Sequence, residues 1–171
     1  AYDNPVIQMV GGKFVGTPTS VDSGDPVVAW HDAYGYQTPH LDTFLLGSLT
    51  TSTGSATGAT KTGLGAFRDI DILAHVTTLG GTSPTLDIYL DSRMDGTTFF
   101  NIAHLTQFTA SGTVAVHLTK RDAASEILSF GADAGGGTIR AIGWGDELRF
   151  RSTVAGTSPS ATFRIWLHGI G

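Results

Sequence analysis

The alternation that decides the fold is clearest in residues 67–76, which read FRDIDILAHV. Positions 70, 72, 74 and 76 are apolar, whereas positions 69, 71 and 75 carry polar side chains. Side chains on a β-strand point alternately to opposite faces, so this period of two predicts a strand with one buried face. Residues 86–90, LDIYL, repeat the pattern, and similar segments predict strands at 98–105, 113–119, 148–154 and 161–167. Residues 126–130 fit either a short strand or one helical turn.

The predicted core consists of the apolar residues at the inward positions of these strands. They are Ile70, Ile72, Leu86, Ile88, Val114, Val116, Leu118, Leu148, Phe150, Phe163 and Ile165. Intervening residues such as Asp87, Tyr89, Asp91, Arg149, Arg151 and Trp166 are expected to face outward. Short alternating segments separated by Gly, Asp, Ser and Thr predict an all-β fold, an antiparallel β-sandwich of the jelly-roll type.

The tetrapeptide Gly-Thr-Ser-Pro occurs twice, at residues 81–84 and 156–159, each time between two alternating segments. Glycine permits backbone angles that other residues avoid, Thr and Ser bond to nearby backbone, and Pro suits the first residue of a strand. We therefore predict two equivalent β-hairpins that turn at residues 82–84 and 157–159, one in each half of the sandwich.

Composition restricts the chemistry that this chain can perform. Its 171 residues are 40% hydrophobic and 15% charged, with no cysteine and a net charge of -5. Disulfides and thiolate catalysis are therefore excluded, and the scattered basic residues form no stripe that would bind nucleic acid. No apolar run is long enough to span a bilayer, and the start at Ala1 shows no leader pattern. We expect a soluble protein made in the cytosol and trimmed of its initiator Met, without membrane or direct nucleic-acid partners.

Residues 1–40 differ from the rest and are predicted to form an extended N-terminal arm, followed by a sandwich domain at 41–171. Four prolines, at positions 5, 18, 26 and 39, prevent continuous strand pairing there. The arm is nevertheless apolar enough to need a surface to lie on, which can be its own domain, a neighbouring copy or a scaffold. Its aromatic residues are the predicted partner-binding anchors: Trp30, Tyr34, Tyr36, Tyr2 and Phe14.

Residues that could carry catalysis do not form a recognisable motif. The six histidines, at 31, 40, 75, 104, 117 and 168, have no zinc-binding spacing. Asp69, Asp71 and Asp87 could share the outer face of one hairpin, and two of them could act as the paired carboxylates of a glycosidase, but solubilising side chains explain them better. Residues 91–96, DSRMDG, fit a hairpin turn closed by Asp-Gly better than a calcium loop. We expect no enzyme activity, no cofactor and no metal.

Three segments resemble a family of viral proteins. Residues 81–103, GTSPTLDIYLDSRMDGTTFFNIA, together with 148–151, LRFR, and 154–163, VAGTSPSATF, resemble small β-sandwich structural proteins encoded by tailed bacteriophages. That group includes capsid decoration, or cement, proteins.

The resemblance implies a virion protein on the capsid surface, made in the host cytoplasm, that stabilises the shell without catalysis. Its implied partners are the major capsid protein or another virion protein, and neighbouring copies in a homo-oligomer such as a trimer. The alternatives are a protein that attaches tails or fibres and a carbohydrate-binding β-sandwich module; exposed coplanar aromatic residues would distinguish the latter.

Overall fold

The computed structural model describes residues 41–121 and 131–170. The predicted arm, its boundary at residue 40 and the segment 126–130 lie outside these residues. Within the described ranges, no helix has the length and apolarity needed to cross a bilayer.

The described chain is all-β, as the alternation predicts. Its seven strands are β1 (Leu41–Ser52), β2 (Ala56–Thr57), β3 (Asp69–Arg93), β4 (Phe99–His104), β5 (Gly112–Thr119), β6 (Thr138–Ile139) and β7 (Glu147–Ile170). All their pairings are antiparallel. Strands β3 and β7 are far longer than the others, with 25 and 24 residues, and they organise the whole domain.

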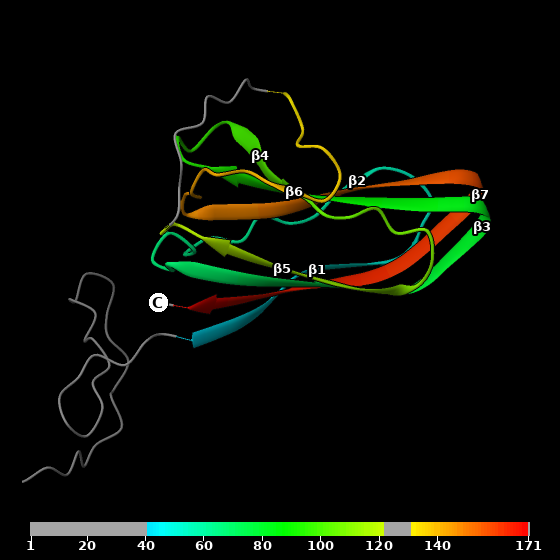
Figure 1. Cartoon of the computed structure of the whole chain (residues 1–171), viewed down its shortest axis with the longest axis horizontal. Helices are drawn as coiled ribbons and strands as arrows, with labels where there is room; N and C mark the ends of the chain where they lie inside the picture. Colours follow the sequence, from blue (N-terminus) through cyan, green and yellow to red (C-terminus); the bar gives the residue numbers. More distant parts are fainter. Residues whose placement is uncertain (1–40, 122–130, 171) are drawn as a thin grey trace, which may run out of the picture. The chain divides into compact units, whose positions relative to one another are not determined.

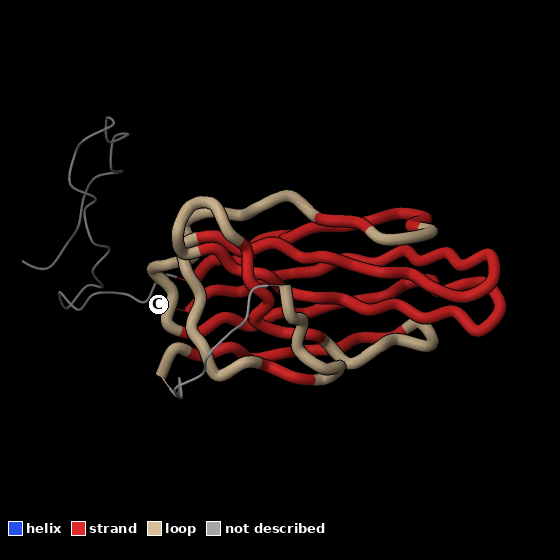
Figure 2. Tube along the Cα trace, turned by 90° about the horizontal axis from the view of Figure 1, so that it is seen from above, coloured by secondary structure: helices blue, strands red, loops and turns tan. Residues whose placement is uncertain are grey.

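The two long strands pair with each other from end to end and pass together from one layer of the sandwich to the other (Figure 1). In the first layer, the first half of β3 lies between β5 and the second half of β7, and β1 forms the opposite edge. In the second layer, the order is β2, β7, β3, β4 and β6. Figure 2 shows the long strands running side by side to the end where they bend.

The two Gly-Thr-Ser-Pro segments form this bend, so the prediction of two hairpins there is wrong. Thr82 pairs with Thr157 across the bend, and both halves of each long strand pair with the other long strand and not with each other. Gly81 and Gly156 have φ of 113° and 124°, which favour glycine. A Cβ on Gly81 would lie 2.8 Å from the Ser158 carbonyl oxygen, and one on Gly156 would lie 2.9 Å from that of Ser83. The repeated motif thus makes two interlocking corners.

The core lies between the layers and confirms the predicted inward faces. All the predicted core residues except Val114 and Val116 are almost completely buried, and these two are partly buried against the core from the edge strand β5. The rings of Phe150 and Phe163 meet edge to face at a centroid distance of 5.8 Å. These two residues lie in different halves of β7, so one strand contributes to both sides of the core.

The turn predicted at Asp95 and Gly96 is confirmed as the hairpin between β3 and β4, where Arg93 pairs with Phe99. The Asp95 carboxylate accepts hydrogen bonds from the backbone N–H groups of Thr97 and Thr98 at 2.9 and 2.6 Å. These bonds hold the pKa of Asp95 well below its usual range. The carboxylate therefore stabilises the turn in its ionised form.

Candidate interface on an outer sheet face

Exposed apolar side chains gather in one row across the outer face of the first layer. Leu45 of β1 pairs with Trp166 of β7, which pairs with Leu73 of β3, which pairs with Ala115 of β5. Leu45, Trp166 and Leu73 are 38%, 36% and 41% exposed, and they are three of the five large exposed hydrophobic residues in the described part of the chain. We call these four residues the apolar row.

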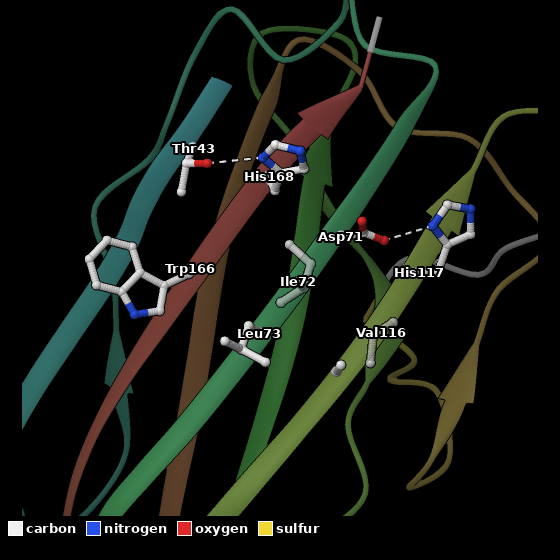
Figure 3. Close-up of a pocket in the computed structure, with 9 residues that line it drawn as sticks. Thr43, Asp71, Ile72, Leu73, Val116, His117, Trp166 and His168 are labelled. Atoms are coloured by element: carbon white, nitrogen blue, oxygen red, sulfur yellow. Dashed lines mark hydrogen bonds and ion pairs between the residues drawn. The ribbon is translucent and has the colours of Figure 1, made fainter. Parts of the chain in front are cut away.

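A polar row lies on one side of the apolar row, two residues further along each strand. It contains Thr43, His168, Asp71 and His117, and we call it the histidine–aspartate row. Thr43 Oγ1 and His168 Nδ1 are 2.9 Å apart, and Asp71 Oδ1 lies 2.8 Å from His117 Nδ1. Figure 3 shows these two pairs with Trp166 and Leu73 beside them.

A second polar row lies on the other side of the apolar row. It contains Ser48, Arg164, His75 and Thr113, and we call it the arginine row. All four side chains are exposed. The face therefore consists of an apolar stripe between two polar borders, one with a carboxylate and the other with a guanidinium group.

Trp166, Leu73 and Ala115 of the apolar row line a shallow hollow on this face together with the histidine–aspartate row. In residues 41–121 and 131–170, no group of three or more His, Asp or Glu side chains is placed to hold a metal ion. Apolar side chains flanked by polar groups can bind another macromolecule, because association removes the apolar surface from water while the border stays hydrated.

The three acids considered and disfavoured for glycoside hydrolysis do not share one face. Asp69 and Asp71 lie on the first layer, whereas Asp87 lies on the second. Asp69 pairs with Arg121 at 2.9 Å, and a hydrogen bond from Thr119 together with Arg121 lowers its pKa. These carboxylates serve separate local structures.

The outer face of the second layer carries a charged cluster. Asp91 was expected to face solvent, but it is only 2% exposed. Arg151 donates hydrogen bonds from Nε and Nη2 to the two carboxylate oxygens of Asp91, at 2.6 and 3.0 Å. Its Nη2 also donates to Asp133 at 2.5 Å. These bonds, led by the one to Asp91, raise the pKa of Arg151. Asn101 donates to Asp91 at 3.3 Å. We call these four residues the clasp.

The clasp holds the segment 131–137 over the sheet. The Ala134 N–H donates to Asn101 Oδ1 at 2.9 Å, and the Ala134 carbonyl lies 2.9 Å from His104 Nδ1. The other ring nitrogen of His104 lies 3.0 Å from Asp87, and its ring stacks on Tyr89 at 4.1 Å. The glycines at 135–137 therefore belong to a loop segment with several attachments to the sheet. These contacts give the clasp a structural role, which is to attach residues 131–137 to the sheet.

The predicted anchors Trp30, Tyr34, Tyr36, Tyr2 and Phe14 all lie outside the described residues, so they stay predictions. Trp166 was expected to face outward, and the structure joins it to Leu45 and Leu73. Leu73 carried a usable signal, because it is the only apolar residue at the outward positions 69, 71, 73 and 75. Leu45 carried none, because the bulge in β1 next to it changes the alternation.

Comparisons with known proteins give similarity to solved structures and match no family. No protein-family model matches the sequence, and no curated protein matches it significantly. Among solved structures, the chain is similar to one described as "Structure of infectious bursal disease virus Gx strain", with a TM-score of 0.40 and 13% identity. The match covers 91% of this chain and 40% of that chain, so this chain spans less than half the length of its neighbour.

Proposed function

We propose that this protein is a non-catalytic structural component of a virus particle that attaches to the outside of a capsid and stabilises the shell. The observation that carries the proposal is the apolar row, because apolar side chains on an open sheet face provide a surface for adhesion. The resemblance of residues 81–103, 148–151 and 154–163 to β-sandwich structural proteins of tailed phages, a group that includes decoration proteins, supplies the kind of particle.

Adhesion alone is sufficient for this role. A protein that binds only the assembled shell stabilises it by mass action, since the added contacts must break before shell subunits separate. Two attachments on one molecule bind more tightly than either alone, because the second forms at a high effective concentration. In this proposal the arm attaches to the major capsid protein, with Trp30, Tyr34 and Tyr36 as its main anchors. The outer face of the first layer, which carries the apolar row, is the second adhesive surface.

Locating the protein in particles tests the proposal. An antibody against the purified protein would be used on density-gradient fractions and in immuno-electron microscopy of particles from producing cells. We expect the protein to sediment with particles and the label to decorate heads. Label confined to tails or fibres would support the attachment alternative, and protein found only as free molecules would contradict a virion role.

Removing residues 1–38 separates attachment from folding. We expect the truncated chain to keep a cooperative thermal transition but to lose incorporation into particles, because an extended segment adds contact area and little core. Each of Trp30, Tyr34 and Tyr36 changed to Ala should weaken binding by about 1–3 kcal/mol if its ring fills a pocket. Unfolding of the truncated chain, with no partner found for the full chain, would show that the arm is part of the core.

A carbohydrate-binding module is the second candidate, favoured by the exposed indole of Trp166. The ring of Tyr89, the other aromatic residue expected to face outward, is stacked on His104 and lies under Arg151. Trp166 is the one Trp, Tyr or Phe residue in the apolar row and its two polar borders. A glycan array decides between the candidates: saccharide binding that Trp166→Ala abolishes would favour the module.

A further inference from the structure

The opposite charges on the exposed face lie on opposite sides of the apolar row. Asp71 precedes Leu73 by two residues in β3, and Arg164 precedes Trp166 by two residues in β7, which runs antiparallel. At about 3.4 Å per residue, each polar row lies about 7 Å from the apolar row. The Asp71 side chain is 50% exposed and Arg164 is also exposed, so both can reach a partner.

This arrangement is complementary to itself. A two-fold axis along the apolar row places that row against its own copy and turns the histidine–aspartate row onto the partner's arginine row. Asp71 then faces the row that holds Arg164 of the other copy, about 5 Å to the side on the neighbouring strand. The symmetry creates the same pair a second time.

The charges also select this axis over the other in-plane choice. A two-fold axis along the strands would place each polar row against its own copy. Asp71 would then approach Asp71 of the partner, and Arg164 would approach Arg164, which is unfavourable. Both axes place the apolar row against its own copy, but only the axis along that row also places the acidic group near a basic group.

The size of the face indicates how strong such pairing can be. The part that is four strands wide is as long as the eight residues of β5. At usual strand spacings this is about 26 Å by about 19 Å, or about 500 Å² per copy. A standard interface buries about 800 Å² per partner, so this contact is weak in isolation and becomes effective where copies are held close together.

From these observations we infer that the outer face of the first layer pairs with the same face of a second copy, about a two-fold axis that runs along the apolar row. The inference rests on the proposed adhesive function of this face and names its partner. The two sheets pack as aligned layers, with Trp166 and Leu73 of both copies at the centre.

Sedimentation equilibrium of the full-length protein, from about 10 µM to about 1 mM, measures the pairing in the range expected for a small interface. We expect Leu73→Lys and Trp166→Lys each to weaken self-association by at least about tenfold, because each buries an unpaired charge at the centre. Ile139→Lys is the matched control, since Ile139 is 47% exposed on β6 in the second layer and should leave association unchanged. Thermal unfolding verifies that each variant folds.

Charge reversal tests the axis without changing the apolar row. Asp71→Arg places Arg against Arg164 of the partner, and Arg164→Asp places Asp against Asp71, so each variant alone should associate more weakly. An equimolar mixture of the two variants restores both opposite-charge pairs and should associate as the unchanged protein does. The double variant should also recover association.

The outcomes separate this inference from the proposed function. A full-length protein that stays monomeric to about 1 mM, or a mixture that fails to recover, overturns the two-fold pairing. If the protein is monomeric and Trp166→Lys still abolishes incorporation into particles, the face binds a shell protein and the proposed function stands. Pairing that follows the predicted variants, in a protein absent from particles, supports the inference and overturns the virion role.

Discussion

The outer face of the second layer carries a charged cluster around the buried Asp91, and residues 131–137 are hydrogen-bonded across it, whereas the apolar row on the first layer is not covered by any described residue. Ionic groups such as Asp91 are costly to bury unless they are fully paired, and the chain supplies the pairing groups itself. Apolar side chains need no directed partner, so they can remain exposed until another surface covers them. Within the described residues, the charged face is therefore satisfied internally, whereas the apolar face is left open, and this openness is the basis of the proposed pairing.

The largest expected loss of stability comes from substitutions in the hydrophobic core that the two layers share. Ile72 in the first layer and Ile88 in the second are both almost completely buried. Changing either one to Ala should lower the free energy of unfolding by about 2–5 kcal/mol, because each leaves a cavity in the same core. Urea unfolding measures both. A loss below about 0.5 kcal/mol at one site only would show that the two layers do not share a core.

The next largest loss of stability is expected when a substitution breaks the clasp. Asp91→Ala removes the more buried partner of Arg151, the ion pair with Arg149 at 3.4 Å and an acceptor for Asn101, at a carboxylate that is only 3% exposed. We expect a loss of about 2–3 kcal/mol, below the 3–5 kcal/mol of a fully buried pair because the Arg151 side chain is 31% exposed. Asp133→Ala, at the more exposed end of the clasp, should cost less than about 1 kcal/mol. Equal losses would mean that burial of Asp91 does not matter.

A smaller effect is the loss of stability at low pH. Hydrogen bonds to Asp95, and the ion pair of Arg93 with Glu147, hold the pKa values of both carboxyls below their usual range. A lowered folded-state pKa stabilises the protein above the unfolded-state pKa, about 4, and this contribution is lost as pH falls through the folded-state value.

The paired variants Asp95→Asn and Glu147→Gln test this directly. Each should be less stable than the unchanged protein at neutral pH, and the difference should narrow as the pH falls from about 7 to about 2. Urea midpoints across that range measure it. A difference that stays constant with pH would contradict an ionic contribution.

The smallest effect on stability belongs to the apolar row. Leu73→Ser should change the free energy of unfolding by no more than about 0.5 kcal/mol, because the side chain is 41% exposed at the sheet surface. The same variant should weaken association. A loss of 2 kcal/mol or more in urea unfolding would instead place Leu73 in the folding core and remove the contrast between the two faces.

The sequence predicts the inward residues well because alternation is a local property. Ile70, Ile88 and Phe163 follow from a period of two alone, and all three are buried. The Gly-Thr-Ser-Pro segments were misinterpreted because a corner and a hairpin turn need the same residue types. Which one forms depends on whether a strand pairs with its own continuation or with a distant strand, and local sequence carries little information on that choice.

The candidate site depends even more on distant residues. The apolar row joins Leu45, Trp166 and Leu73 from three strands, and only the register of the sheet places them side by side. Asp91 shows the reverse case, because an outward position became buried under a segment about 40 residues away. The burial of an outward residue cannot be derived from its own strand.

The passage of β3 and β7 through both layers has a mechanical consequence. In a sandwich whose layers are joined only by loops, a force that pulls the layers apart acts on side-chain contacts and flexible connections. Here two continuous strands of the chain, β3 and β7, cross between the layers side by side and are paired at the corner, as at Thr82 and Thr157. Tension applied to one layer is therefore carried into the other along the backbone, and the sandwich should yield as one body rather than open like a hinge.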